Sequence, residues 1–244
     1  MDRQRFSNIA HTRCEFASPI SEWKACQIMD KLTIKKGNLL LDIGCGFGAW
    51  TNLAAELYGC KGTGIDHNPE AIKRAKAKGT SVKYHVVNAN ELDPIQYDGI
   101  LCIGSTHALG GLEGTLEFCR TRLKPGAKLL IGEGFWAKKP EAAYLEKLGG
   151  SDDQFSTHAE NALRITNAGY RLWYSSASSQ DDWDEYEGRY RYSIVEWCEN
   201  NPSDPEASDY LARSDSWYDA YLRWGRETLG FGFYVASLDT SQLK

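Results

Sequence analysis

The chain has 244 residues and a formal net charge of −5, which suffices for one α/β domain with an insertion around one sizeable core. The acidic balance excludes a general electrostatic attraction to nucleic acid or to an anionic membrane surface, so we expect a small molecule as the ligand. The N-terminal stretch has no apolar run of the signal-peptide type, and no later run reaches membrane-spanning length, so we expect a cytoplasmic protein.

The first 36 residues are expected to form a helical cap in front of the first strand. The segment Arg3–Phe16 is amphipathic, and Ser18 and Pro19 followed by Glu22 are typical of a helix start. No tract with the composition of a flexible linker follows, so we predict that residues 1–244 form a single domain.

Strands and helices alternate after the cap. Apolar runs bounded by turn residues predict strands at Leu39–Ile43, Gly62–Asp66, Val82–Val87, Gly99–Gly104 and Lys128–Glu133. Helical spacing predicts helices at Trp50–Tyr58, Pro69–Lys78 and Leu112–Leu123, which end at Gly59, Gly79 and the pair Pro125-Gly126. This alternation predicts a doubly wound, mostly parallel sheet with helices on both faces.

Two late apolar runs, Gly169–Ser175 and Gly232–Leu238, are expected to complete the sheet. Between them Trp, Tyr and Leu recur at helical spacing with a break around Asn200–Pro205, which predicts a helical insertion at residues 181–229. The α/β core then comprises residues 37–180 and 230–244. The seven cysteines include no C-x-x-C pair, so we expect neither a disulfide framework nor a metal site.

The stretch LLLDIGCGFGAW, residues 39–50, ends the first strand in a glycine loop. Such a turn brings backbone N–H groups and a helix N-terminus toward the carboxyl end of the sheet, where side chains would block a ligand. Gly44, Gly46 and Ala49 satisfy the dinucleotide fingerprint, which is weak evidence alone. Asp66 ends the next strand, where an acidic residue accepts both hydroxyls of a ribose. Nicotinamide and adenosyl cofactors both carry such a ribose.

The stretches LLLDIGCGFG, GTGID, VVNAN, YDGILCIG and LKPGAKLLIGE, in this order and spacing, resemble the successive motifs of class I S-adenosylmethionine-dependent methyltransferases. NAGYRLWYSS and GFGFYVASL resemble the hairpin with a reversed seventh strand in that fold. More narrowly, HTRCEFASPISEWKA, CIGSTHALGG and the insertion resemble a largely uncharacterised bacterial group of small-molecule methyltransferases. The resemblance implies a seven-stranded Rossmann-like methyltransferase fold and S-adenosyl-L-methionine as cofactor.

Carried over position by position, the resemblance implies roles around the glycine loop. Asp42 and the loop residues Gly44, Cys45 and Gly46 would face the methionine part of the cofactor. Asp66 would bind its ribose hydroxyls.

On the adenine side, the resemblance implies contacts from His67 and Ala89. Asn88 stands where many relatives have an aspartate facing the adenine amino group. An amide oxygen can accept from that group but lacks the strength of a charged acceptor, so this departure bears on cofactor affinity. The backbone carbonyls at Ile103 and Gly104 match the acceptor of the methionine amino group.

Methyl transfer from a sulfonium is an in-line displacement with a good leaving group, so alignment and exclusion of water can supply much of the catalysis. If a proton must leave the acceptor, His107 after the fourth strand is the candidate base, although such a histidine can equally be structural. Glu133, at the end of the fifth strand, could bind a cationic acceptor or orient the base. His11, and Tyr190 or Tyr192 of the insertion, could reach the same space if the cap and insertion close over it.

We therefore predict a methyltransferase that moves a methyl group to an N, O or S atom of a small molecule. We expect no nucleic-acid or membrane partner, and a homodimer stays open. A nicotinamide-dependent oxidoreductase and a non-catalytic S-adenosylmethionine-binding protein are the alternatives. The oxidoreductase would be expected to continue with a second mononucleotide-binding half, which the two late runs do not resemble.

Overall fold

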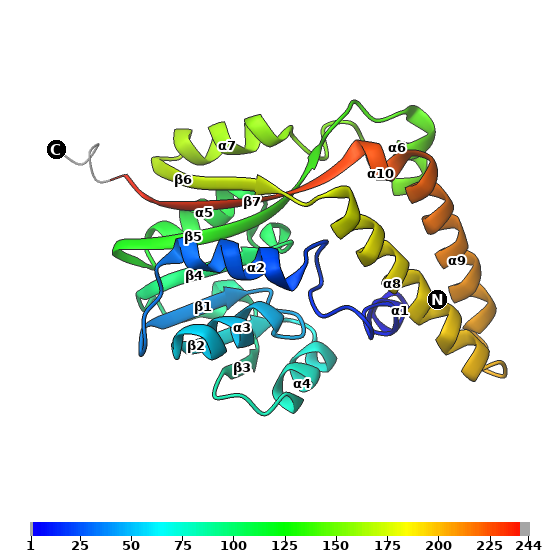
Figure 1. Ribbon diagram of the computed structural model, residues 1–244, viewed down its shortest axis with the longest axis horizontal. Coiled ribbons are helices and arrows are strands. Elements are labelled where there is room, and N and C mark those ends of the chain that lie inside the picture. The colour runs from blue at the N-terminus through cyan, green and yellow to red at the C-terminus, as the bar shows by residue number, and fades with distance from the viewer. Residues whose placement is uncertain (1, 240–244) are drawn as a thin grey trace.

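The computed structural model describes residues 2–239 and contains one seven-stranded sheet with helices on both faces (Figure 1). The strand order is β3-β2-β1-β4-β5-β7-β6. Neighbours from β3 to β5 are parallel, whereas β7 runs antiparallel to both β5 and β6. The predicted doubly wound, mostly parallel α/β fold with a reversed last strand is confirmed. The strands are β1 (Leu39–Ile43), β2 (Lys61–Asp66), β3 (Lys83–Val86), β4 (Tyr97–Ile103), β5 (Leu123–Trp136), β6 (Tyr170–Ala177) and β7 (Leu229–Leu238).

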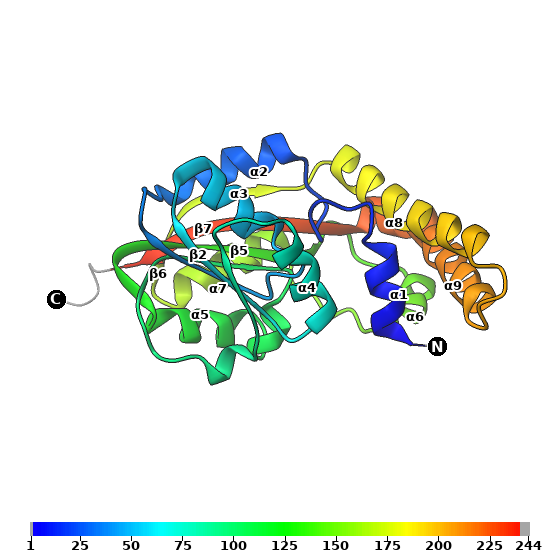
Figure 2. The ribbon, with the colours of Figure 1, turned by 90° about the horizontal axis from the view of Figure 1, so that it is seen from below.

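Ten α-helices lie within the described residues, joined by three short 3-10 turns and one π-helical turn, η4 (Tyr221–Gly225). The α-helices are α1 (Arg3–Ala10), α2 (Glu22–Met29), α3 (Ala49–Tyr58), α4 (Pro69–Ala77), α5 (Leu112–Arg120), α6 (Ala142–Leu148), α7 (His158–Asn167), α8 (Gln180–Asn200), α9 (Ala207–Ala220) and α10 (Arg226–Thr228). Figure 2 shows α2 and α3 on one face of the sheet and α5 and α7 on the other.

The core consists of two apolar layers because successive strand residues point to opposite faces of the sheet. Leu40 and Leu130 pack under α2 and α3. Their neighbours Leu41 and Leu129 pack on the opposite side, with side chains of α5 and α7. Since both faces are covered, the central strands are continuous apolar runs rather than alternating ones. Their carboxyl ends remain accessible at one edge, and that edge carries the candidate site.

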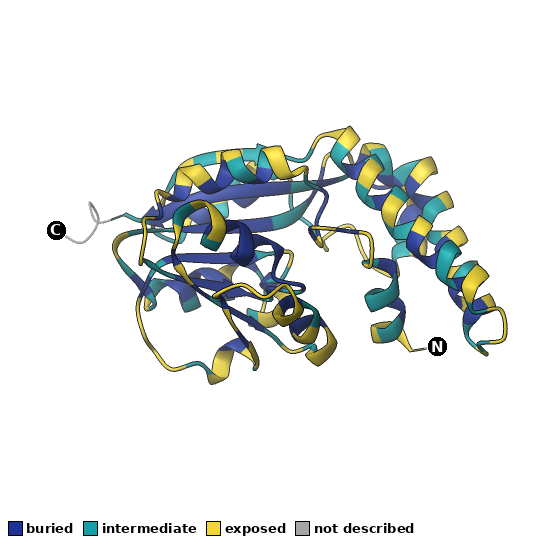
Figure 3. Cartoon of the chain, turned by 60° about the horizontal axis from the view of Figure 1, so that its bottom comes forward, coloured by how far each residue is buried: buried dark blue, intermediate teal, exposed yellow. Residues whose placement is uncertain are grey.

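The insertion forms a pair of helices, α8 and α9, that projects beyond the sheet, with α1 packed against it (Figures 1 and 2). Phe6 of α1, Ile194 of α8 and Tyr210 of α9 are buried together in a small apolar cluster of their own. Figure 3 shows that the outer sides of these helices are exposed. Helix α1 and the insertion, far apart in sequence, therefore form one packed unit beside the sheet, whereas α2 of the predicted cap packs on the sheet itself.

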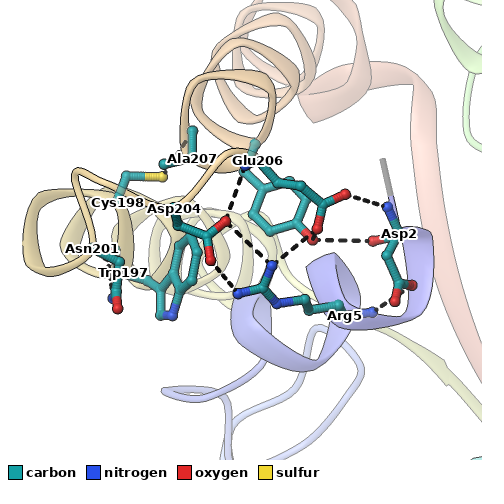
Figure 4. A network of polar contacts seen from close by, with 9 residues as sticks. Asp2, Arg5, Trp197, Cys198, Asn201, Asp204, Glu206 and Ala207 are labelled. Carbon is teal, nitrogen blue, oxygen red and sulfur yellow. Dashed lines mark hydrogen bonds and ion pairs between the residues drawn. The ribbon is translucent and has the colours of Figure 1, made fainter.

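An ionic cluster fastens the start of the chain to the α8–α9 connection (Figure 4). The Arg5 guanidinium donates to Asp204, at 2.6 Å, and to Glu206, at 3.0 Å. Glu206 also accepts from the backbone N–H of Asp2, at 2.7 Å, and from the Tyr210 hydroxyl, at 2.6 Å. These contacts lower the pKa of Glu206 to about 2. The cluster ties the cap to the insertion rather than to the sheet.

The structure departs from the predicted elements on the β5 side. Strand β5 begins at Leu123, so α5 ends earlier than predicted, and Pro125-Gly126 lies inside the strand. The pairing of β4 with β5 is irregular there, and Gly126 has a positive φ of 77°, so the strand accommodates this pair at a bulge. Helices α6 and α7 follow β5 and were not predicted.

The predicted break in the insertion is confirmed, because α8 ends at Asn200 and α9 begins at Ala207. No helix in residues 2–239 is both long and apolar enough to span a bilayer. The seven cysteines all lie within this range and are free thiols. The same residues contain no group of three or more His, Cys, Asp or Glu side chains placed to hold a metal ion.

Candidate active site

The glycine loop between β1 and α3 has a backbone that only glycine accommodates at two of its positions. Gly44 and Gly48 have positive φ values of 67° and 76°. A Cβ at Gly44 would lie 2.3 Å from the Ser105 Cβ, and one at Gly48 would lie 2.3 Å from the Tyr84 hydroxyl oxygen. The absent side chains let the loop lie against β3 and the β4 exit. A Cβ at Gly46 would meet no atom within 4 Å, so the middle of the loop faces open space.

Asp66, at the end of β2, holds this loop in place. Its carboxylate accepts the backbone N–H of Gly46 at 2.9 Å and that of Asn68 at 2.8 Å. A carboxylate has about four acceptor sites, so these two bonds leave capacity for a ligand's hydroxyls. Asp66 and the glycine loop therefore lie side by side in the fold.

Asp42 lies beneath the loop and is almost completely buried. It accepts a hydrogen bond from the Thr51 hydroxyl at 2.5 Å. Burial raises the pKa of Asp42 to about 7, against the opposing effect of this hydrogen bond. Asp42 therefore supports the loop from below and lines its recess.

A narrow recess of about 30 Å³ lies over the loop, walled by Asp42, Gly44–Phe47 and Ile103 and by Glu15, Ala17 and Ser18 of the cap. Two buried donors of its lining residues, Ser18 Oγ and Trp50 Nε1, find no hydrogen-bond partner among residues 2–239. Unpartnered buried donors are costly unless a ligand or water satisfies them.

The residues expected near the adenine lie at the open side of the loop. His67 is 72% exposed, and its Nδ1 is 3.5 Å from Asp66 Oδ1. Asn88 is exposed and donates through Nδ2 to Glu91 Oε1 at 3.2 Å, whereas Ala89 is buried. Because the Asn88 amide nitrogen donates to Glu91, the amide oxygen is the atom that remains available to a ligand.

Two large clefts open from the end of β4. The first, the cap-side cleft, has a volume of about 730 Å³ and lies between the cap, the insertion and the sheet edge. The second, the β5-side cleft, has a volume of about 780 Å³ and lies toward α5 and α7. They share Gly104, Trp183, Leu229 and Phe231 as walls. Only the cap-side cleft also shares Ala17 and Ser18 with the recess over the glycine loop.

The predicted catalytic residues are divided between these clefts. His107 and Glu133 line the β5-side cleft, where Glu133 Oε2 accepts from the Thr106 hydroxyl at 2.5 Å. Burial raises the pKa of Glu133, and the nearby His107 acts in the opposite direction. Tyr190 lines the cap-side cleft, where burial raises its pKa to about 12. The structure therefore brings His107 and Glu133 together but places Tyr190 apart from them.

His11, which was expected to reach this space, lines the cap-side cleft and pairs there with Tyr186, a contact that was not predicted. His11 Nδ1 lies 2.7 Å from the Ser7 carbonyl oxygen, which can only accept, so Nδ1 carries the proton. His11 Nε2 then accepts from the Tyr186 hydroxyl at 3.0 Å. Burial lowers the pKa of His11, which agrees with this neutral form.

Glu187 is the second group that was missed. It is 3% exposed, lines the cap-side cleft and accepts a hydrogen bond from Trp217 Nε1 at 2.8 Å. A signal was present in the sequence, because Trp183, Glu187 and Tyr190 recur at helical spacing and so share one face of α8. A carboxylate on an aromatic face is unusual unless that face borders a site.

Comparison with known proteins finds that the chain is similar to methyltransferases. A family model described as a methyltransferase domain matches residues 41–129. The chain is 29% identical to the Escherichia coli (strain K12) protein YjhP, described as uncharacterised, over 96% of this chain and 98% of that protein.

Two solved structures are similar over almost the whole fold. One is an S-adenosylmethionine-dependent methyltransferase from Geobacter sulfurreducens in complex with S-adenosyl-L-homocysteine. It has a TM-score of 0.90, 27% identity, and coverage of 96% of this chain and 98% of that one. The other, from Thiobacillus denitrificans with the same ligand, has a TM-score of 0.88, 28% identity and coverage of 98% and 100%. The likeness therefore includes the cap and the insertion as well as the sheet.

Proposed function

This chain is an S-adenosylmethionine-dependent methyltransferase, and from this premise we propose that it transfers the methyl group to an N, O or S atom of a small molecule. One observation carries the proposal: a glycine loop that Asp66 holds by the Gly46 amide opens beside two clefts of small-molecule size. S-adenosylmethionine supplies a methyl carbon bonded to a positively charged sulfur. The lone pair of the acceptor forms the new bond to that carbon as the carbon–sulfur bond breaks toward sulfur.

The chain's own residues then have two tasks, to align the acceptor and to keep the reacting atoms dry. Asp42, Gly44, Cys45, Gly46 and Ile103 surround the recess that would take the methionine end of the cofactor. The ribose would take the free acceptor sites of the Asp66 carboxylate, and the adenine would lie along His67, Asn88 and Ala89.

We place the acceptor in the cap-side cleft because its wall continues through Ala17 and Ser18 into the recess. Within that cleft Tyr190 and the His11–Tyr186 pair are the groups able to receive or relay a proton. His107 and Glu133, in the β5-side cleft, are the alternative base and orienting carboxylate.

Calorimetric titration tests the cofactor assignment. S-adenosylhomocysteine should bind and stabilise the folded chain against heat, whereas NAD should do neither, since only a ligand of the native state raises its stability. Heat from NAD alone would favour the oxidoreductase alternative.

Turnover tests the enzymatic assignment. Incubation of S-adenosylmethionine with the protein and a cell extract should yield S-adenosylhomocysteine and a methylated small molecule, identified by untargeted metabolite profiling with and without enzyme. Binding without any methylated product would instead support a non-catalytic binding protein.

A histidine substitution decides between the clefts. If His107 is the base, His107→Ala should reduce turnover far more than affinity for S-adenosylhomocysteine. Unchanged turnover would remove His107 from the mechanism and leave the cap-side groups as the candidates.

The remaining predictions concern the domain organisation, the location and the oligomeric state of the chain. We propose that the chain works as a single domain in which residues 1–36 and 181–229 enclose the acceptor beside the core of residues 37–180 and 230–244; residues 240–244 lie outside the described range. A cytoplasmic location and a homodimer stay predictions.

A further inference from the structure

We propose that the cap-side cleft recognises an ammonium group, held between the Glu187 carboxylate and the surrounding aromatic rings, so that the acceptor molecule is a small amine or alkylammonium compound. This inference rests on the proposed function, since it names the substrate class for the same site.

Glu187 is the first observation. It is 3% exposed and accepts a single hydrogen bond, from Trp217. No cationic side chain among residues 2–239 lies within ion-pair distance of it. A buried carboxylate is normally paired, because removing an unpaired charge from water is costly. The cleft therefore offers a negative group that the fold itself leaves without a counter-ion.

The rings around this carboxylate are the second observation. Trp183, Tyr186 and Tyr190 extend from the same face of α8, and Trp217 adds a ring from α9. Adjacent ring centroids are 6.3 Å apart for Trp183–Tyr186 and 6.4 Å for Tyr186–Tyr190. The faces of such rings attract cations, most strongly where water is excluded. Carboxylate and rings together fit an organic ammonium better than a metal ion, which would require more oxygen ligands.

The charges at the cleft mouth do not oppose this arrangement. Arg3, Lys147 and Arg213 line the cleft but are exposed, as is Glu146. Solvent and salt screen exposed charges, whereas the interaction of a bound cation with Glu187 takes place out of water. The basic mouth favours a molecule whose other end is neutral or anionic.

Burial also raises the pKa of Glu187 to about 7. An unpaired buried carboxylate is partly protonated near neutral pH, and a bound cation would favour its ionised form. Ammonium binding should therefore strengthen as the pH rises through 7. The tyrosines around it ionise only at higher pH, and the neutral His11 at lower pH.

The test uses a matched pair of probes, choline and the uncharged 3,3-dimethylbutan-1-ol, which have the same shape. Each is titrated calorimetrically into the full chain, with and without saturating S-adenosylhomocysteine. Choline should bind about tenfold or more tightly than the alcohol. Equal affinities, or no heat from choline in either state, would overturn the proposal. Because S-adenosylhomocysteine is titrated separately, absence of its heat alone would contradict the proposed function instead.

Two variants assign the effect to the cleft. Glu187→Gln keeps the volume and an acceptor for Trp217 but removes the charge, so choline affinity should fall to that of the alcohol. Glu199→Gln, on the exposed side of the same helix, should leave both affinities unchanged. If Glu187→Gln does not fold, Tyr190→Leu removes one ring and should weaken choline selectively. Undiminished choline binding in the folded variant would overturn the proposal.

Discussion

The glycine loop and the cap-side cleft are built in opposite ways. The loop site consists of backbone from one continuous segment, held by the hydrogen bond from the Gly46 N–H to the Asp66 carboxylate. The cleft consists of side chains from several separate elements, among them α1, α6, α8, α9 and β7, and its central carboxylate, Glu187, accepts one hydrogen bond among the described residues. A backbone site recognises a constant ligand with little tolerance for change, whereas a side-chain site can be adapted to different acceptors. A backbone site for a constant cofactor and a side-chain site for a variable methyl acceptor would differ in this way.

The largest expected effect comes from adding one methyl group to the loop. Gly44→Ala places a Cβ 2.3 Å from the Ser105 Cβ at a positive φ, so we expect loss of S-adenosylhomocysteine binding and a destabilisation of about 2–4 kcal/mol. Calorimetry and thermal unfolding measure the two effects.

Gly79→Ala is the matched control for Gly44→Ala. It has the same φ of 67° but open space around its Cβ, so it should cost about 1–2 kcal/mol and leave binding intact. If Gly44→Ala binds the ligand as well as Gly79→Ala does, the loop is less constrained than its backbone indicates.

The next effect concerns the carboxylate that holds the loop. Asp66→Asn retains one acceptor oxygen but loses the charge, so affinity for S-adenosylhomocysteine should fall about 10- to 100-fold. Asp98→Asn is the comparison, since Asp98 also accepts a backbone N–H, from Leu39, at the other end of the sheet. That variant should change stability but not affinity. Equal losses of affinity in both variants would show a general effect on the fold rather than a ribose contact.

A smaller effect is the pH dependence of stability that Glu187 contributes in the cleft. The pKa of Glu187 is higher in the folded chain, about 7, than its ordinary value near 4.3. The folded state therefore binds the extra proton between these values, and wild-type stability falls as the pH rises from about 4 to 7. Glu187→Gln removes this loss, so at pH 8 it should be more stable than wild type by up to about 3 kcal/mol.

Denaturant unfolding at pH 5 and pH 8 measures this difference. Glu199→Gln, which is exposed, should show no such gain. A Glu187→Gln variant that is equally destabilised at both pH values would mean that the carboxylate is needed for packing.

The smallest effect should come from the ionic cluster that joins the cap to the insertion. Arg5→Gln removes the bonds to Asp204 and Glu206, which lie at the surface, so the global stability should change little. Amide hydrogen exchange in α1 should accelerate while affinity for S-adenosylhomocysteine stays the same. Unchanged exchange in α1 would show that the apolar cluster around Phe6 alone holds the cap.

Helices and strands whose bounds depend on residues close in sequence were predicted well. β1 matches its predicted bounds, and α4 begins at Pro69 as predicted. Both are fixed by near neighbours, an apolar run in the first case and a proline at a helix start in the second. The start of β5 was wrong because Pro125-Gly126 is a turn signal locally, yet β4 supplies pairing partners on either side of it. Helices α6 and α7 were not predicted because few of their residues are buried, Tyr144 in α6 and Asn161 and Ile165 in α7, which leaves little apolar periodicity in the sequence.

The same contrast holds for the site. The order of residues alone predicted that the glycine loop and Asp66 lie at one edge of the sheet, because a glycine turn after a strand and an acid at the next strand end are local features that a parallel sheet brings together. Only the tertiary structure decided that His107 and Tyr190 border different clefts, and that His11, Tyr186 and Glu187 meet in one. The reason is physical: those residues come from α1, α8 and a strand-end loop, whose relative positions depend on long-range packing that no local pattern encodes.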